Sequence, residues 1–271
     1  YKINVRRDLY AELRRSKDSL MKLYYQSYVD DSIGATYLAH LKKHIDSFAK
    51  GEVDVQPLTP PDSYAHPVME FRCARQVVRN AIVAARDNYD AIMLGHIQDS
   101  GLWESKSVVD IPVMGLGEAT MLYACSLGMR IGIVTINPRF IPGFHKQIRH
   151  YGLEHRVAGV EAMPFEPGEM TKAFDSEEQY ERVLNAFQQF AEPLVEKGID
   201  VLIPGGGIPM LLFEREHNFN VKGAPVINGI PILIKMAEMA VELKQLNGLG
   251  VSRSSDMVIP PDYVLEELLG F

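Results

Sequence analysis

The stretch 91-AIMLGHIQDSGL-102 carries most of the information on the fold of this chain. It begins with a short apolar run, which is typical of a strand buried on both faces of a parallel sheet, and it continues into a polar turn that contains glycine. A second stretch of the same design is 201-VLIPGGGIPM-210. Each stretch predicts a strand that ends at the carboxyl edge of a sheet, where open α/β proteins bind their ligands.

Strands and helices alternate around these two stretches. Further apolar runs predict strands at residues 20–26, 53–58, 130–135 and 156–163. Amphipathic stretches predict helices between the strands, at residues 35–51, 69–88, 118–128, 138–152 and 176–198. Such alternation indicates βαβ units with parallel strands, so the predicted class is α/β.

The predicted strands form two sets, one before residue 100 and one between residues 130 and 206, and each set is followed by a similar crossover, IPVMGLGEA and APVINGIPI. We therefore expect two pseudo-symmetric, doubly wound (Rossmann or flavodoxin-like) lobes with parallel sheets and an active site in the cleft between them. The expected division is an N-terminal arm at 1–19, a first lobe at 20–114 plus 225–247, a second lobe at 115–224 and a C-terminal tail at 248–271. Leu265, Leu268 and Leu269 share one face of the tail, and an oligomer contact is one use for such a face.

Composition narrows the range of partners. The net charge of -7 disfavours nucleic acid, because binding to a polyanion depends on a basic surface. No apolar run approaches the roughly 20 residues that cross a bilayer, and the first residues are too charged for a signal peptide. We expect a cytoplasmic protein, assembled as a homo-oligomer, that binds a small molecule and neither nucleic acid nor membrane. Cys73 and Cys125 each lie in a helix-like apolar pattern, so we expect both to be core residues, without a disulfide or a cysteine-based zinc site.

His96 is the first candidate for chemistry, because it ends the strand of the opening stretch and Asp99 follows it in the turn. Histidine exchanges a proton near neutral pH with little tuning. We predict that His96 is a general acid or base, oriented by Asp99 or by a backbone carbonyl. The alternative is a core histidine bonded to a neighbouring carbonyl. Glu118 is a third catalytic candidate, although a carboxylate at the start of a helix is equally well explained as a cap.

The predicted binding residues also follow strands. Gly205, Gly206 and Gly207 could present backbone amides to a carboxylate or an oxyanion, or could simply form a tight turn. The spacing of these glycines fits neither a P-loop nor a dinucleotide fingerprint. Ser27, Thr135 and Asn137 are short hydrogen-bonding side chains suited to binding the substrate oxygens. Thr135 and Asn137 could equally cap the helix that is predicted to begin at Pro138.

A divalent metal is an alternative that the sequence leaves open, although the prediction is an enzyme without a cofactor. His66 and Glu70 have the i, i+4 spacing that lets two side chains share a helix face. The candidate ligands are His96, Glu118, His145, His66 and Glu70, which offer nitrogen and oxygen donors without a tight spacing signature. A metal-dependent hydrolase that uses the same cleft is therefore one competing function.

Several ordered pieces together resemble a known family. HIQDSGL followed by DIPVMGLGEA, then RIGIVT, then DVLIPGGGIPM followed by APVINGI, are similar over roughly residues 20–247 to the hydantoin racemase branch of the aspartate/glutamate racemase superfamily. The resemblance implies two lobes with the active site between them and a small carboxylate or a cyclic amide as substrate.

The resemblance also implies a difference in chemistry. Racemases of this superfamily place one cysteine on each side of the substrate carbon, and the matching positions here are His96 and Gly206, give or take one residue. We therefore expect acid-base chemistry on one side only, of the isomerase or the lyase and decarboxylase type. A binding protein that has lost catalysis is the remaining alternative.

Overall fold

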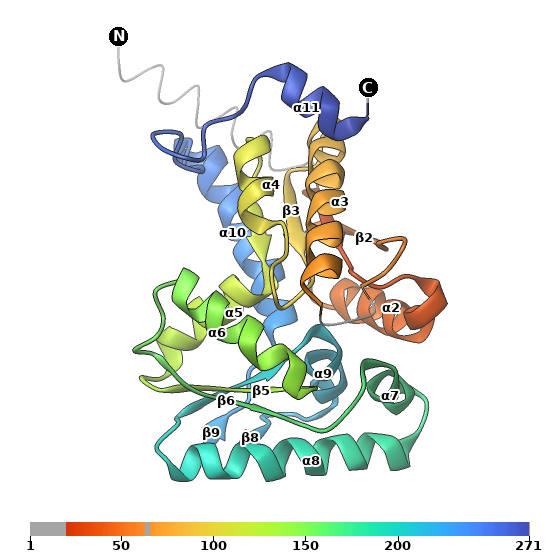
Figure 1. The fold of residues 1–271 in the computed structure, drawn as a ribbon, viewed down its shortest axis with the longest axis vertical. Coiled ribbons are helices and arrows are strands. Elements are labelled where there is room, and N and C mark those ends of the chain that lie inside the picture. Colours follow the sequence, from red (N-terminus) through yellow and green to blue (C-terminus); the bar gives the residue numbers. More distant parts are fainter. Residues whose placement is uncertain (1–19, 63–65, 271) are drawn as a thin grey trace.

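The computed structural model describes residues 20–62 and 66–270, which form two α/β lobes, one above the other in Figure 1. In the first lobe β1 (Lys22–Gln26), β2 (Glu52–Gln56), β3 (Ala91–Leu94) and β4 (Val113–Gly115) make a parallel sheet with the order β2-β1-β3-β4. In the second lobe β5 (Ile131–Thr135), β6 (Val157–Ala162) and β7 (Val201–Gly205) make a parallel sheet with the order β6-β5-β7. The predicted α/β class with two parallel-sheet lobes is confirmed.

Helices cover both faces of the first sheet, as its apolar strands require. Along β3, Ile92 and Leu94 pack in one cluster with α3 (Pro67–Arg86) and α4 (Leu102–Val108). Ala91 and Met93 point the other way, into a cluster with α2 (Asp31–Asp46) and α10 (Gly229–Asn247). Side chains of successive strand residues alternate between the two faces, so a four-residue strand supplies both cores.

The second sheet is covered in the same manner. Val134 and Leu202 pack against α8 (Glu177–Glu196), the long helix at the bottom of Figure 1. Ile133 and Ile203 face α5 (Leu116–Leu127) and α6 (Ile141–His150). This last group belongs to the same core cluster as Leu23 and Tyr25 of β1, so one continuous apolar core joins the two lobes.

Shorter elements complete the chain, and hydrophobic periodicity did not predict most of them because each has too few turns. They are α7 (Pro167–Thr171), α9 (Gly207–Leu212), α11 (Asp262–Leu269), the 3-10 turns at Pro138–Phe140, Lys172–Phe174 and Phe213–Arg215, and the antiparallel pair β8 (Asn220–Val221) and β9 (Ala224–Pro225).

The C-terminal tail folds back on its own chain. Leu269 is buried, and Leu265 and Leu268 pack on the cluster that contains α3. Arg253 fastens the tail by donating hydrogen bonds to the carbonyl oxygens of Lys106 and Val109. The leucine face that the sequence offered as an oligomer contact is therefore used within the chain. The predicted N-terminal arm lies outside the described residues.

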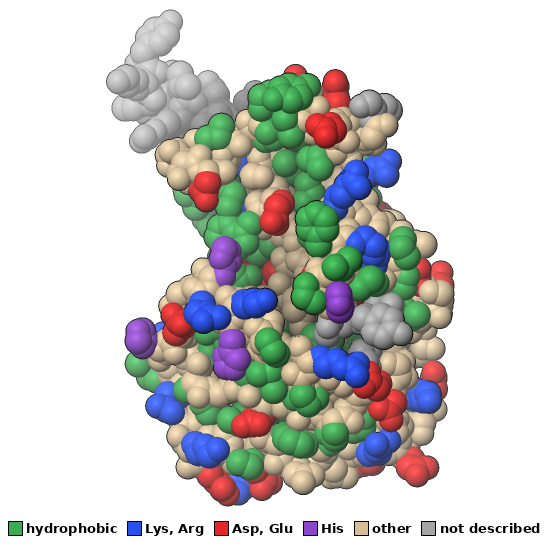
Figure 2. All heavy atoms as spheres, viewed as in Figure 1, with side chains coloured by type: hydrophobic (Ala, Val, Ile, Leu, Met, Phe, Trp, Pro, Cys, Tyr) green, Lys and Arg blue, Asp and Glu red, His purple; other side chains and the backbone are tan. Residues whose placement is uncertain are grey.

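The surface agrees with a small-molecule partner. Acidic and basic side chains are interspersed on the face shown in Figure 2, rather than gathered into one basic patch. Within residues 20–62 and 66–270, no helix has both the length and the apolar character needed to cross a bilayer.

Candidate active site

A cavity of about 210 Å³ lies between the lobes, at the carboxyl ends of both sheets. Its walls include Ser27 after β1, Gly95 and His96 after β3, Ile136 after β5 and Gly206 after β7. Parallel strands direct their ends to one edge of a sheet, so two such edges that face each other enclose a binding site. The predicted cleft is therefore present, and His96 lies on its wall.

The imidazole of His96 is held flat against an aromatic ring. It stacks on Tyr28 with ring centroids 4.4 Å apart and an angle of 16° between the planes. Tyr28 is itself buried, and its hydroxyl donates a hydrogen bond to the carbonyl oxygen of Ser100. The His96 side chain retains 17% exposure, so the ring is fixed in place but remains accessible from the cavity.

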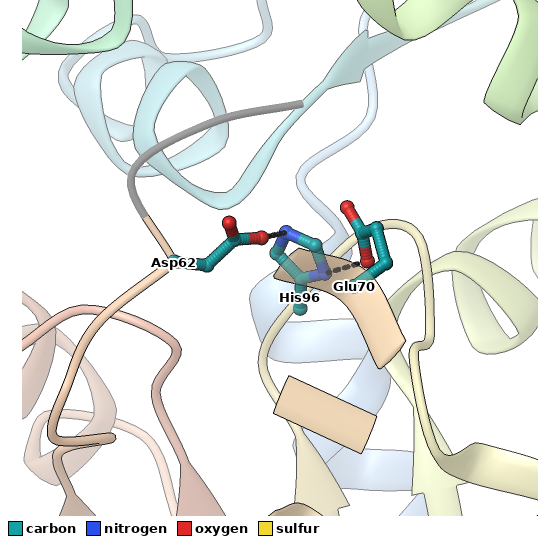
Figure 3. A group of neighbouring side chains, drawn as sticks. All are labelled: Asp62, Glu70 and His96. Atoms are coloured by element: carbon teal, nitrogen blue, oxygen red, sulfur yellow. Dashed lines mark ion pairs between the residues drawn. The ribbon is translucent and has the colours of Figure 1, made fainter. Parts of the chain in front are cut away.

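Carboxylates approach both edges of this imidazole (Figure 3). Oδ2 of Asp62 lies 3.4 Å from Nε2, and Oε2 of Glu70 lies 4.0 Å from Nδ1. Asp62 lines the cavity with His96, whereas the Nδ1 edge is buried away from it. The sequence did not single out Asp62, because it is not close to His96 along the chain, and it considered Glu70 only as a possible metal ligand with His66, His96 and His145.

The loop that carries Asp62 is fastened from α3. The guanidinium of Arg72 donates hydrogen bonds of 2.6 Å and 2.7 Å to the carbonyl oxygens of Pro60 and Pro61. The backbone amide of Asp62 donates to the carbonyl oxygen of Tyr28 at 2.8 Å. Side chains supported by such contacts keep one geometry, which is what proton transfer requires.

Glu70 is positioned by the start of α3. Pro67 occupies the first turn of this helix, and Nδ1 of His66 accepts a hydrogen bond from the amide of Val68 at 3.2 Å. Proline and a side-chain acceptor at these positions favour a helix that begins here. The hydroxyl of Ser100, which follows His96, donates to the carboxylate of Glu70.

Asp99 does not orient His96, contrary to the prediction. Its buried carboxylate accepts hydrogen bonds from the amides of Gly117 and Glu118 at 2.9 Å and 2.6 Å, and thus caps α5. Tyr151 and Gln147 donate to Oδ2 at 2.5 Å and 3.0 Å. Burial raises the pKa of Asp99 to about 7, although these hydrogen bonds act in the opposite direction. The first amides of a helix have no partner within it, and Asp99 accepts from two of them instead of facing the imidazole.

Glu118 is also placed away from the cavity wall. Its carboxylate forms an ion pair with Lys106, with oxygen to nitrogen distances of 2.8 Å and 2.7 Å. Both side chains are 14% exposed. Glu118 does not line the cavity, so the structure gives it no catalytic contact. Its carboxylate does not cap α5 either, because Asp99 accepts from the first-turn amides and Glu118 pairs with Lys106.

The predicted oxygen-binding side chains separate into two groups. Ser27 lines the cavity beside Tyr28. Thr135 is fully buried and donates to the carbonyl oxygen of Gly205 at 2.8 Å. Asn137 accepts from the amide of Arg139 at 3.0 Å and donates to the carbonyl oxygen of Phe165 at 2.9 Å. Thr135 and Asn137 therefore support the wall from behind, because their polar groups are engaged by neighbouring backbone.

Gly205, Gly206 and Gly207 line the cavity from the second lobe, as predicted for a glycine wall. The amide of Gly206 donates to the carbonyl oxygen of Pro204 at 2.8 Å, so it is already engaged. A Cβ atom on Gly207 would lie 3.0 Å from the hydroxyl of Tyr37 and 3.5 Å from the carbonyl oxygen of Gly95. The two lobes approach so closely here that a side chain would intrude into the cavity.

Of the predicted metal ligands, the structure brings together Glu70 and His96 but not the others. His66 caps α3, His145 is exposed on α6 and Glu118 is paired with Lys106. The structure instead groups Asp62, Glu70 and His96, with one possible ligand atom from each within 4.8 Å of the others. The Asp62 oxygen lies at one edge of the ring and the Glu70 oxygen at the other, whereas a single ion would bind only one ring nitrogen (Figure 3).

The thiols play no part in this site. Cys73 is buried, as predicted, and burial raises the pKa of its thiol to about 12. A thiol so far from ionisation is a poor nucleophile and a poor metal ligand. Cys125 is partly buried against the main core.

Most of the cavity surface is apolar. The apolar and aromatic lining residues are Tyr28, Val29, Ile33, Tyr37, Ile97, Ile136, Phe140, Ile208 and Pro209. Within the part of the chain that the structure describes, no lysine or arginine lines the cavity, whereas Asp62 adds a carboxylate. Such a site suits a ligand that is compact, weakly charged and partly apolar.

Comparisons with known proteins agree with this geometry. The sequence model of the Asp/Glu/Hydantoin racemase family matches residues 41–237. A hydantoin racemase from Pseudomonas sp. (strain NS671) is 26% identical over 191 residues, which cover 70% of this chain and 74% of the relative.

Two solved structures share the fold. Allantoin racemase from Klebsiella pneumoniae superposes with a TM-score of 0.71 at 20% identity, covering 89% of this chain and 94% of that chain. A variant of arylmalonate decarboxylase in its liganded form superposes with a TM-score of 0.53 at 12% identity, covering 86% and 96%. The family match spans more than half of the sequence, and the chain therefore belongs to the Asp/Glu/Hydantoin racemase family.

Proposed function

We propose that this protein is an enzyme that transfers a proton on one face of a small cyclic amide or carboxylate, with His96 as the acid-base residue. The observation that carries the proposal is the placement of His96, which lines the cavity with Asp62 from the first lobe, while Gly205, Gly206 and Gly207 line it from the second. The stretch that carries His96 is also the one in which the sequence resembles the first cysteine loop of the racemases.

The chemistry follows from the two walls. Nε2 of His96 removes the proton from the carbon next to a carbonyl group, and the electron pair of the broken C–H bond moves onto the carbonyl oxygen. A backbone amide of the glycine wall, such as that of Gly207, donates to this oxygen. The imidazolium then delivers its proton from the same face, because the glycine wall has no side chain that can deliver one from the other side. Delivery to another atom of the delocalised anion gives an isomer, whereas return to the original carbon regenerates the substrate and is seen only as exchange with solvent.

The cavity favours a cyclic amide over an amino acid or a dicarboxylate. A substrate with two carboxylates needs cationic partners. The cavity lining, within the described residues, has the carboxylate of Asp62 and no lysine or arginine. The relatives named above include enzymes for hydantoin and allantoin, which supports a cyclic amide. The arylmalonate decarboxylase neighbour indicates a lyase as the other reaction type, in which loss of carbon dioxide generates the anion that His96 protonates. An arylmalonate carries two carboxylates, so the lining beside Asp62 favours this reaction less than proton transfer on a cyclic amide.

Deuterium exchange tests one-sided proton transfer. Each enantiomer of a 5-substituted hydantoin is incubated with the protein in D₂O at neutral pH, and the C5 proton is followed by NMR while chiral chromatography follows configuration. We expect exchange of one enantiomer with its configuration retained, and loss of exchange in His96→Gln. Racemisation coupled to exchange would contradict the proposal. Ligand binding without exchange, or without decarboxylation of an arylmalonate, would indicate a binding protein.

A metal-dependent hydrolase is the second candidate, because Asp62, Glu70 and His96 are grouped within reach of one ion. Zn²⁺ and Mn²⁺ accept such a set of nitrogen and oxygen donors. Elemental analysis of the purified protein, followed by assay after treatment with EDTA, separates the two functions. A stoichiometric metal whose removal abolishes ring opening would favour the hydrolase, whereas exchange that is unchanged by EDTA would favour proton transfer by His96.

A further inference from the structure

The carboxylates of Asp62 and Glu70 lie at the two edges of the His96 ring, and the proton transfer proposed for His96 does not itself use them. We propose that Glu70 and Asp62 are positioning residues that determine which nitrogen of His96 carries the proton. This inference rests on the proposed role of His96 in proton transfer. It assigns opposite effects to the two acids, because each lies at a different ring nitrogen.

The geometry separates the two effects. Glu70 faces the buried Nδ1 edge, and a proton on Nδ1 leaves the lone pair of Nε2 directed to the cavity, as a base requires. Asp62 faces Nε2 and lines the cavity, so it favours the tautomer that has its proton on Nε2. A neutral imidazole has only one N–H and therefore serves only one of the two acids.

The competition between the two tautomers of His96 ends when the ring becomes charged during the reaction. When Nε2 takes a proton from the substrate carbon, the ring becomes an imidazolium with an N–H at each nitrogen. Nδ1–H then points to Glu70 and Nε2–H to Asp62, and both ion pairs stabilise the charge that has formed. The distances of 3.4 Å and 4.0 Å in the free protein are longer than good hydrogen bonds. Catalytic hydrogen bonds often shorten once substrate is bound.

The surroundings keep the ring in this orientation. Stacking on Tyr28 fixes the plane of the imidazole, and the hydroxyl of Ser100 holds the carboxylate of Glu70. Arg72 holds the loop of Asp62 through Pro60 and Pro61. The titratable groups that the structure records against the ring are therefore Tyr28, Asp62 and Glu70, and Tyr28 has its pKa raised by burial, so it stays neutral.

Histidine tautomers can be measured without a substrate. Long-range ¹H–¹⁵N spectra of the full chain at alkaline pH distinguish Nδ1–H from Nε2–H, and the His96 signals are those that disappear in His96→Gln. We expect Asp62→Asn to increase the Nδ1–H form and Glu70→Gln to increase the Nε2–H form, each changing the ratio by about fivefold or more. Glu104→Gln, which removes an exposed carboxylate from neighbouring α4, is the control and should leave the ratio unchanged.

The outcome decides between positioning and a merely structural role. The proposal would be overturned if the ratio of Nδ1–H to Nε2–H moved in the same direction in Asp62→Asn and Glu70→Gln. It would also be overturned if the ratio stayed unchanged in both variants while they remained folded. A wild-type ratio that changes on adding EDTA would also overturn it, because a metal would then be fixing the ring. If deuterium exchange is found, Glu70→Gln should lower kcat by about 10²-fold with little change in KM. A tautomer shift without any exchange would leave the positioning role in place and reject the proposed function.

Discussion

The hydroxyl of Tyr151 donates a hydrogen bond of 2.5 Å to Oδ2 of Asp99. Tyr151 follows α6 of the second lobe, and Asp99 lies in the turn after His96 in the first lobe. Gln147 of α6 reinforces this link by donating to the carbonyl oxygen of Ile97 at 2.7 Å. The turn that carries the candidate catalytic residue is thus fastened to the opposite lobe, which keeps the cavity walls at a fixed separation.

Tyr151→Phe should weaken this link. We expect the free energy of unfolding to fall by about 1–3 kcal/mol, because the variant removes a hydrogen bond to a buried carboxylate. Urea denaturation at neutral pH measures the loss. Tyr123→Phe is the matched control, since Tyr123 is 46% exposed. An equal loss in both variants would mean that the Asp99 contact contributes no specific stability.

Asp99 should make stability depend on pH in an unusual direction. Its pKa is about 7 in the folded state, raised by burial, and about 4 in an unfolded chain. Between these values the folded protein holds a proton that the unfolded chain has released, so the contribution of Asp99 to the free energy of unfolding is present below pH 4 and is lost as pH rises to 7. Urea denaturation of wild type and Asp99→Asn across this range isolates the contribution, because the difference between them should shrink toward pH 7. A constant difference would show that Asp99 ionises normally.

Gly207→Val should close the cavity without unfolding the protein. Its Cβ atom would already lie 3.0 Å from the Tyr37 hydroxyl, and the added methyl groups would extend into the space for substrate. We expect KM to rise at least tenfold while the melting temperature changes little. Gly143→Val on α6 is the control, because a Cβ atom there meets nothing within 4 Å. Unchanged binding in Gly207→Val would place the substrate elsewhere.

The sequence predicted the fold well because parallel strands and amphipathic helices have strong periodic signals. The strand at 91–94 and the glycine wall at 205–207 were found in this way. The partners of His96 were not, because Asp62 follows a different strand and reaches the imidazole only through the tertiary fold. Proximity along the chain favoured Asp99, but the amides at the start of α5 bind that carboxylate instead. Thr135 and Asn137 lie close behind the predicted wall, and hydrogen bonds to neighbouring backbone explain their positions.

The double variant His96→Cys/Gly206→Cys should convert one-sided exchange into racemisation. It places a thiol at each of the two positions where the sequence resembles the cysteine loops of the racemases. A Cβ atom on Gly206 would lie 3.1 Å from Cδ of Pro209, so a small movement of that ring is needed. Loss of optical rotation from an enantiomerically pure 5-substituted hydantoin measures the racemase activity that the double variant gains. The single variants should not racemise, and an inactive but folded double variant would mean that residue 206 does not face the substrate carbon.

Glu118→Gln should affect stability but not chemistry. It removes the charge that pairs with Lys106, where both side chains are only 14% exposed, and should lower the free energy of unfolding by about 1–3 kcal/mol. The rate of deuterium exchange in folded protein should remain within twofold of wild type. A large loss of exchange with normal stability would restore Glu118 as a catalytic residue.

Within the described residues, the side chains that stack on or pair with the His96 ring come from the same half of the molecule, as does the hydroxyl that holds Glu70. Tyr28, Asp62, Glu70 and Ser100 all belong to the first lobe, whereas the glycine wall belongs to the second. A chimera that keeps the first lobe, receives the second lobe of a relative and retains Gln147 and Tyr151 would therefore inherit the residues around the imidazole and acquire a new opposite wall. The architecture allows the reactive group and the shape of its substrate to diverge independently.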